Sequence, residues 1–210
     1  MRIKVTDIRP LLTAFLITTL YACQSLEKKP GDIGKGFPSE KKYQVKSGKI
    51  VYETGLKTIS VNLTYKTIVY FDDYGMKERR DTYDSNHLSD TYLCDGEYLY
   101  QITHTKKRIY RTGKALHGTE PRFDWNKVSQ ADKDSGIAMM LPKENIAGKA
   151  CDVYVVKAGI ATARFAGWKN ILMLYEVKSP GGVNLQQAIS IDTTRVSPKV
   201  FELPKNYRQP

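Results

Sequence analysis

The feature of this 210-residue sequence that most limits its fold is an alternation of apolar and polar residues with a period of two. It is clearest in residues 61–71, where the even positions begin Asn62, Thr64 and Lys66. The odd positions are Val61, Leu63, Tyr65, Thr67, Val69 and Phe71. Successive side chains of a strand point to opposite faces of a sheet, so this pattern predicts a half-buried strand of an antiparallel sheet.

Similar extended segments recur along the rest of the chain, and turn residues separate them. Asp95-Gly96 is a pair favoured in hairpin loops, and Ser179-Pro180-Gly181-Gly182 suits a type II turn. One later strand is expected to place Ile171, Met173, Tyr175 and Val177 on one face, and Leu185, Gln187, Ile189 and Ile191 are expected to line a further strand. Nine or so such strands predict an antiparallel sheet that is strongly curved or closed.

The middle of the chain has a different pattern, because β-branched residues become scarce between Gly118 and Gly136. Residues 124–131 predict a short helix with Trp125, Val128 and Ala131 on one side. Residues 139–142, Met-Met-Leu-Pro, are interpreted as an apolar lip before a loop. The sheet is therefore expected to have one helical interruption.

The first residues have the three-part pattern of an export signal. Arg2, Lys4 and Arg9 precede an apolar run from Leu11 to Leu20, which is too short for a bilayer that needs roughly 20 residues. Leu20-Tyr21-Ala22-Cys23 then resembles a lipobox, apart from the bulky Tyr21. This predicts a lipoprotein signal peptide over residues 1–22 with lipid attachment at Cys23. The alternative is an ordinary signal peptide that is cleaved elsewhere.

Residues 23–42 are rich in charge, Gly and Pro, which predicts a flexible lipidated tether. Residues 43–210 then form one β domain, a usual size for a single core. Cys94 and Cys151 remain once Cys23 is lipidated. In an oxidising compartment they could form a disulfide, or they could be two buried thiols that pack as small apolar groups.

The chain has a formal net charge of +11, which outside the cytoplasm favours contact with anionic lipid headgroups or acidic glycans and not with nucleic acid. Basic residues are concentrated near one expected strand: Lys106, Lys107, Arg108, Arg111 and Lys114. These side chains could meet headgroup phosphates. The alternative is that they keep an edge strand soluble and have no partner.

Four motifs in this order resemble those of exported lipoproteins of Bacteroidetes-type bacteria with domains like the LolA/LolB lipoprotein carriers. They are IVYFDDYG at 68–75, DGEYLY at 95–100, IAGKACDVY at 146–154 and GWKNI at 167–171. The resemblance covers roughly residues 43–207. It implies a mainly β fold, a curved antiparallel sheet or unclosed β-barrel with short helices plugging the concave face. It also implies an acyl chain held between sheet and plug, but it carries over no individual binding residue.

Few residues of the sequence point to catalysis. His87, His104 and His117 lack metal-ligand spacing, and no nucleophile elbow or glycine-rich phosphate loop is present. We therefore expect no catalytic residue, no metal and no cofactor, and a non-catalytic protein in preference to an envelope hydrolase.

The aromatic and apolar residues of the strands are the candidate lining of a ligand cavity, although ordinary core packing is the alternative. The candidates are Tyr65, Val69, Phe71, Tyr100, Ile102, Met139, Met140, Ile171, Met173 and Tyr175. The resulting hypothesis is a lipoprotein of the outer membrane, on either face, that binds an acyl chain such as palmitate or another amphiphile. The alternative is a structural or interaction lipoprotein with a filled core and a protein or glycan partner.

Overall fold

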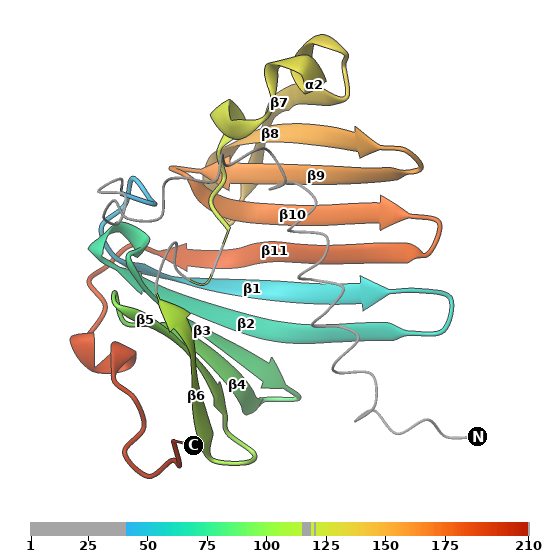
Figure 1. Cartoon of the computed structure of the whole chain (residues 1–210). Helices are drawn as coiled ribbons and strands as arrows, with labels where there is room; N and C mark the ends of the chain where they lie inside the picture. The colour runs from blue at the N-terminus through green and yellow to red at the C-terminus, as the bar shows by residue number, and fades with distance from the viewer. Residues whose placement is uncertain (1–40, 115–118, 120, 210) are drawn as a thin grey trace, which may run out of the picture. The chain divides into compact units, whose positions relative to one another are not determined.

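Eleven strands form one antiparallel sheet in the computed structural model, which describes residues 41–114, 119 and 121–209 (Figure 1). Its first six strands are β1 (Gly48–Lys57), β2 (Asn62–Asp72), β3 (Lys77–Asp84), β4 (His87–Cys94), β5 (Tyr98–Thr103) and β6 (Arg108–Lys114). The other five are β7 (Ala138–Ile146), β8 (Lys149–Ala158), β9 (Ala161–Trp168), β10 (Ile171–Ser179) and β11 (Gly182–Asp192).

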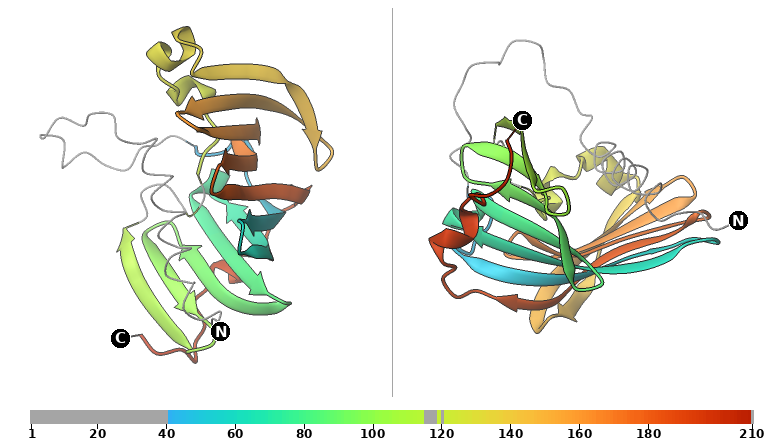
Figure 2. Two further views of the ribbon diagram at one scale, coloured as in Figure 1. Left: turned by 90° about the vertical axis from the view of Figure 1, so that its right-hand side faces the viewer. Right: turned by 90° about the horizontal axis from the view of Figure 1, so that it is seen from below.

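The order of the strands across the sheet is β6-β5-β4-β3-β2-β1-β11-β10-β9-β8-β7. Each strand lies beside its neighbour in the sequence, except that β1 pairs with β11 and that β6 and β7 are the two edges. The sheet is curved and does not close into a barrel (Figure 2). The predicted class, mainly β with a curved antiparallel sheet or unclosed barrel, is confirmed.

The connection between β6 and β7 contains two very short helices in place of the single predicted one. They are η3 (Trp125–Lys127) and α2 (Gln130–Asp134), and Val128 between them is extended. Each helix has its own N-cap, since the Asp124 carboxylate accepts from Asn126 N–H and the Ser129 hydroxyl from Asp132 N–H. A capping residue starts a helix by satisfying a free N–H group, so the second cap divides the predicted helix.

The prediction for residues 139–142 is wrong, because these residues form the first half of the edge strand β7. Pro142 lies where the register of β7 against β8 shifts, between Leu141 and Glu144. Proline donates no backbone hydrogen bond, so within a sheet it is confined to edges and bulges, and both conditions hold here.

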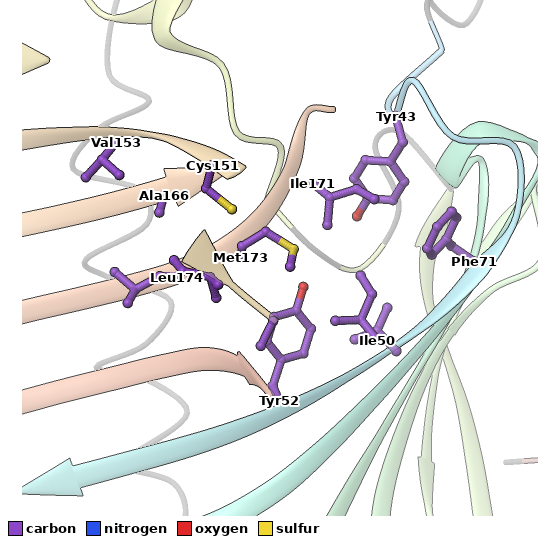
Figure 3. Close-up of a cluster of buried hydrophobic side chains, with 13 residues drawn as sticks. Tyr43, Ile50, Tyr52, Phe71, Cys151, Val153, Ala166, Ile171, Met173 and Leu174 are labelled. Atoms are coloured by element: carbon purple, nitrogen blue, oxygen red, sulfur yellow. The ribbon is translucent and has the colours of Figure 1, made fainter. Parts of the chain in front are cut away.

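The largest buried cluster joins residues of β1 and β2 to residues of β8, β9 and β10 (Figure 3). It contains Tyr43, Ile50, Tyr52, Val69, Phe71, Ile146, Cys151, Val153, Ala166, Ile171, Met173, Leu174 and Ala188. The Tyr52 hydroxyl donates to the Leu172 carbonyl at 2.8 Å. Leu172 lies outside the part of β10 that pairs with β11, so this hydrogen bond joins β1 to β10 where the ladder does not.

Two β-bulges change which side chains share a face. The register of β9 against β10 shifts between Leu172 and Leu174, so Ile171 and Met173 belong to the main cluster and Tyr175 does not. The register of β1 against β11 shifts between Val51 and Tyr52. Gln186 and Ala188 are buried and Ile189 is 56% exposed, contrary to the predicted pattern, whereas Leu185 and Ile191 of the predicted set do pack against the main cluster.

The C-terminal segment packs against the strands at the β6 side of the sheet. It includes η4 (Pro198–Phe201), and Phe201 packs with Leu93, Ile102 and Ile109. Arg208 pairs in parallel with Arg108, which occupies part of the β6 edge.

A buried ion pair fixes the start of the described chain to β3. Lys42 Nζ lies 2.8 Å from both carboxylate oxygens of Glu78, and the Glu78 side chain is fully buried. The Tyr43 hydroxyl also donates to Glu78 at 2.6 Å, and Thr119 N–H donates at 2.5 Å. Lys42, the last residue of the predicted tether, is thus part of the packed domain.

Cys94 and Cys151 are both buried free thiols. Their Sγ atoms donate to the carbonyls of Met76 and Lys149. Cys23, the predicted signal peptide and most of the predicted tether lie outside the described residues. Among the helices that are described, none has the length and apolar character to cross a membrane.

Candidate functional site

A row of side chains crosses seven strands on one face of the sheet. Directly opposed residues of an antiparallel ladder point to the same face, so the register defines the row. From β2 to β7 it consists of Tyr65, Thr54, Gln186, Tyr175, Phe165, Tyr154 and Met140. We call this face the inner face and this set the inner row.

Three rings of the inner row contact one another in sequence across the strands. The ring centroids of Tyr154 and Phe165 lie 4.9 Å apart with nearly parallel planes. Those of Phe165 and Tyr175 lie 5.4 Å apart and are tilted. The rings present a continuous aromatic surface across β8, β9 and β10, and Phe165 and Tyr175 are only partly buried.

The β6–β7 connection covers the β8 end of this aromatic surface. Phe123 and Trp125 pack on Tyr154, with ring centroids 5.3 and 5.2 Å from it. Phe123 also lies on Gly167, the residue opposite Leu172 in the ladder. The connection therefore borders the inner row on one side and leaves Phe165 and Tyr175 partly accessible.

The other half of the inner row is polar. Thr54 lies between Tyr65 and Gln186 in the ladder, and Thr67 is its diagonal neighbour on β2. Thr54 is 2% exposed, Thr67 is fully buried, and among the described residues neither hydroxyl has a hydrogen-bond partner. Buried polar groups are normally paired, so these two hydroxyls are an exception that needs a cause.

A charged side chain lies beside these threonines. Arg80 is opposite Val69 on β3, which places it on the inner face, and its Nη2 donates to Gln186 Oε1 at 3.1 Å. The pair joins β3 to β11 and so crosses β2 and β1, the strands of Thr67 and Thr54. Tyr92 is opposite Arg80 on β4, and burial, aided by Asp90, raises the pKa of its phenol. Tyr92 is therefore a neutral neighbour of Arg80.

A pocket of about 250 Å³ lies beside Tyr65 but mostly on the opposite face of the sheet, because Glu53, Lys66 and Tyr83 of its lining alternate with residues of the inner face. Its lining combines aromatic, amide and charged groups: Tyr52, Glu53, Thr64, Tyr65, Lys66, Tyr83, Ser85, Asn86 and Ile189.

The structure brings only some of the sequence-predicted cavity residues together. Tyr65, Met140 and Tyr175 belong to the inner row. Met139 alternates with Met140 and so faces the other side of the edge strand. Four of the others are fully buried in the main cluster: Val69, Phe71, Ile171 and Met173. The remaining two pack in the cluster beneath the C-terminal segment: Tyr100 and Ile102.

Sequence reasoning missed most of the site. The residues it did not select are Thr54, Thr67, Arg80, Phe123, Trp125, Tyr154, Phe165 and Gln186. Tyr154 and Phe165 occur in segments that read as strands, so their aromatic character was a usable signal. Thr54, Thr67 and Gln186 carried no usable signal in the sequence, because only the strand register shows that they lie next to one another.

The basic residues noted in the sequence lie at the β6 edge, and all five are exposed: Lys106, Lys107, Arg108, Arg111 and Lys114. The Arg111 guanidinium lies 4.7 Å from the centre of the Tyr98 ring, and Arg108 donates to the Tyr110 hydroxyl at 3.3 Å. This edge is therefore a separate cationic surface that also carries tyrosines.

Within the described ranges, no group of three or more His, Cys, Asp or Glu side chains could hold a metal ion. The inner row itself contains hydroxyl, amide, phenol and apolar groups, and it contains no two carboxylates or histidines that could act as a paired acid and base.

The sequence matches no protein-family model and no curated protein. Solved structures do share the fold. An uncharacterized conserved protein from Thermus thermophilus is similar with a TM-score of 0.53 and 6% identity, over 79% of this chain and 90% of that one.

A LolA superfamily protein from Nitrosomonas europaea is similar with a TM-score of 0.43 and 11% identity, over 77% and 92% of the two chains. A DUF1329 family protein from Desulfovibrio piger is similar with a TM-score of 0.38 and 11% identity, over 76% and 90% of the two chains. The structural neighbours thus include LolA superfamily domains at low sequence identity.

Proposed function

We propose that this protein is a non-catalytic binder of an acyl chain or similar amphiphile, which lies along the aromatic part of the inner row. The observation that carries the proposal is the stack of Tyr154, Phe165 and Tyr175 across three strands, with two of the rings partly accessible. An apolar chain laid on such a surface removes apolar area from water at about 25 cal/mol per Å². The occurrence of LolA superfamily proteins among the structural neighbours supports the same reading.

The arrangement at the end of the row favours a chain-like ligand. Phe123 and Trp125 enclose the row at β8, and Tyr65 on β2 ends the row on the other side. A ligand that reaches from one to the other would cross several strands, which suits an extended hydrocarbon better than a compact metabolite.

The test is mass spectrometry of organic extracts from the full chain purified from cells. We expect non-covalently bound acyl species with the wild-type protein, and about tenfold less with a Phe165→Ala/Tyr175→Ala variant, since each lost ring removes contact area. Tyr110→Ala is the matched control, because Tyr110 is exposed on β6 and outside the row. Extracts free of acyl species from all three proteins would refute the proposal.

We also propose that Cys23 anchors the protein by lipid to the outer membrane, so that the domain works close to its ligand. Two or more acyl chains give a stable anchor because each buried methylene contributes about 0.8 kcal/mol. Cys23→Ser should move the protein from the membrane fraction to the soluble fraction. Persistence of the variant in the membrane fraction would contradict a lipid anchor at this residue.

The β6 edge favours a second candidate function, an interaction lipoprotein with an acidic partner. Lys106, Lys107, Arg108 and Arg111 are exposed together there, and anionic lipid headgroups are the simplest partners for them. Replacing the four by Gln should weaken binding of Cys23→Ser protein to vesicles of anionic phospholipid. Unchanged binding would remove this role.

A further inference from the structure

The polar half of the inner face carries an inference that rests on the proposed function and names the chemistry of the ligand. We propose that Thr54, Thr67, Arg80 and Gln186 form a subsite for the carbonyl or carboxylate oxygens at the end of the acyl chain. The subsite adjoins the aromatic stack directly, since Gln186 is opposite Tyr175 in the ladder.

The first argument is the state of the two threonine hydroxyls. Both are inaccessible to solvent, and within the described part of the chain neither donates or accepts a hydrogen bond. A buried hydroxyl without a partner destabilises the folded protein. Two such hydroxyls close together would therefore only lower the stability of a sheet that had no ligand to bind. In a binding site they become donors that are held ready for an acceptor oxygen of the ligand.

The second argument is position. Thr54 and Thr67 are diagonal neighbours on β1 and β2, a separation of roughly 7–8 Å between Cα atoms. Their hydroxyls can therefore converge on a single group of one to three heavy atoms. A carboxylate or an ester has this size and presents two acceptor oxygens.

The third argument is charge. The hydrogen bond from Arg80 to Gln186 passes across the strands that carry both threonines. A guanidinium carries a permanent positive charge. A positive group at this place favours an oxygen-rich end of an amphiphile over a plain hydrocarbon end.

The ligand would then lie with its polar end over β1 and β2 and its chain along Tyr175, Phe165 and Tyr154 toward the β6–β7 connection. This orientation follows from the row itself, because polar residues occupy its β2–β11 part and aromatic residues its β10–β8 part. The subsite thus determines the direction in which the chain is bound.

The decisive variant is Thr54→Val/Thr67→Val, which removes both hydroxyls and keeps the side-chain shape. In the ligand-free protein it should raise the melting temperature by a few degrees, because unpaired buried polar groups are replaced by apolar ones. The same variant should bind palmitate and methyl palmitate about tenfold more weakly, since two hydrogen bonds to the ligand are lost. A structural role for the hydroxyls would give the opposite sign for stability.

Binding is measured on the full chain carrying Cys23→Ser, by displacement of the neutral fluorescent probe N-phenyl-1-naphthylamine. Thr162→Val is the matched control, since Thr162 is exposed near the end of β9, and it should change neither property. Arg80→Met distinguishes a carboxylate subsite from a carbonyl subsite. If the subsite binds a carboxylate, the variant should lose more affinity for palmitate than for methyl palmitate. If the subsite binds a carbonyl, the variant should lose the same affinity for both ligands.

Two results would overturn the subsite. One is unchanged affinity for palmitate and methyl palmitate in Thr54→Val/Thr67→Val, and the other is a lower melting temperature, which would indicate hydroxyls satisfied by bound water. After either result the proposed acyl binding still stands if the naphthylamine probe binds to the wild-type protein and palmitate displaces it. Failure of that probe and of palmitate to bind the wild-type protein would instead overturn the proposed function.

Discussion

Phe123 lies directly on Gly167, so that a Cβ atom built on this glycine would overlap the phenyl ring. Gly167 is in β9, and Phe123 belongs to the connection between the two edge strands. The contact holds the connection against the sheet, and through it Phe123 and Trp125 reach Tyr154. The absence of a Cβ atom at Gly167 therefore determines where the β6–β7 connection borders the inner row.

Gly167→Ala should lower the free energy of unfolding by about 1–3 kcal/mol, because the added methyl group must displace the ring. The displacement should also change the fluorescence of Trp125, because Phe123 and Trp125 both pack on Tyr154. Urea denaturation followed by fluorescence measures both effects. Gly113→Ala is the control, since a Cβ there meets no atom within 4 Å, and equal stability of the two variants would contradict the role of Gly167.

Breaking the ion pair of Lys42 and Glu78 should destabilise the folded domain strongly, because both side chains are buried. Lys42→Met or Glu78→Gln leaves a buried charge without its counter-ion and should cost about 3–5 kcal/mol of unfolding free energy. The double variant should cost less than the sum of the two, since no lone charge remains. These values come from chemical denaturation of each variant.

The exposed pair of Lys143 and Asp152 provides the comparison for that experiment. Its atoms are 2.6 Å apart, but the side chains are 66% and 50% exposed. Lys143→Met should therefore cost less than about 1 kcal/mol. A loss as large as that of Lys42→Met would show that burial is not what makes the first pair important.

The stability of the domain should fall in mild acid because of His104. Burial lowers the pKa of His104 from its ordinary value of 6.5, although the nearby Asp81 acts in the opposite direction. The unfolded chain then binds a proton more readily than the folded one. The stabilising contribution is thus complete above pH 6.5 and is lost as the pH falls through the lowered pKa.

The hydrogen bonds around His104 define which nitrogen carries the proton. The Thr91 hydroxyl donates to the Asp81 carboxylate at 2.5 Å, so its oxygen accepts from Nε2–H of His104. In the neutral ring Nδ1 then accepts from the Tyr207 hydroxyl at 2.9 Å, which ties the C-terminal segment to the sheet. Melting temperatures between pH 7 and 5 should fall more steeply for the wild type than for His104→Gln. His87→Gln, at an exposed position, should behave like the wild type.

The thiols should be unreactive in the folded protein. Burial raises the pKa of the Cys94 thiol, and it raises the pKa of Cys151 to about 11, so neither forms the nucleophilic thiolate near neutral pH. Titration with a disulfide reagent should detect no thiol in the native protein and two after unfolding without a reductant. No thiol after unfolding would indicate a Cys94–Cys151 disulfide, and three would indicate that Cys23 is unmodified.

Local sequence patterns were enough to predict that the chain forms a mainly β, curved antiparallel sheet. The alternation in residues 61–71 corresponds to β2, which spans Asn62–Asp72, because a side-chain period of two belongs to a single strand and needs no information from elsewhere. The turns at Asp95-Gly96 and Ser179–Gly182 are likewise local. The helix at 124–131 was predicted in the right place but as one element, since the second N-cap at Ser129 was not recognised.

The site depended on relationships that no local pattern contains. Ile171, Met173 and Tyr175 alternate in the sequence, yet the bulge in β10 sends Tyr175 to the aromatic stack and the other two to the main cluster. The register of β1 against β11 places Gln186 beside Thr54, although more than 130 residues separate them.

The sequence by itself determined the class of the fold, because the period of its apolar residues is a property of each strand. Only the tertiary structure decided which residues share the inner face, because bulges and long-range strand pairing set the register. A shift of one residue would exchange the two faces of a strand. The two unpaired threonine hydroxyls are therefore visible only when the complete sheet is assembled.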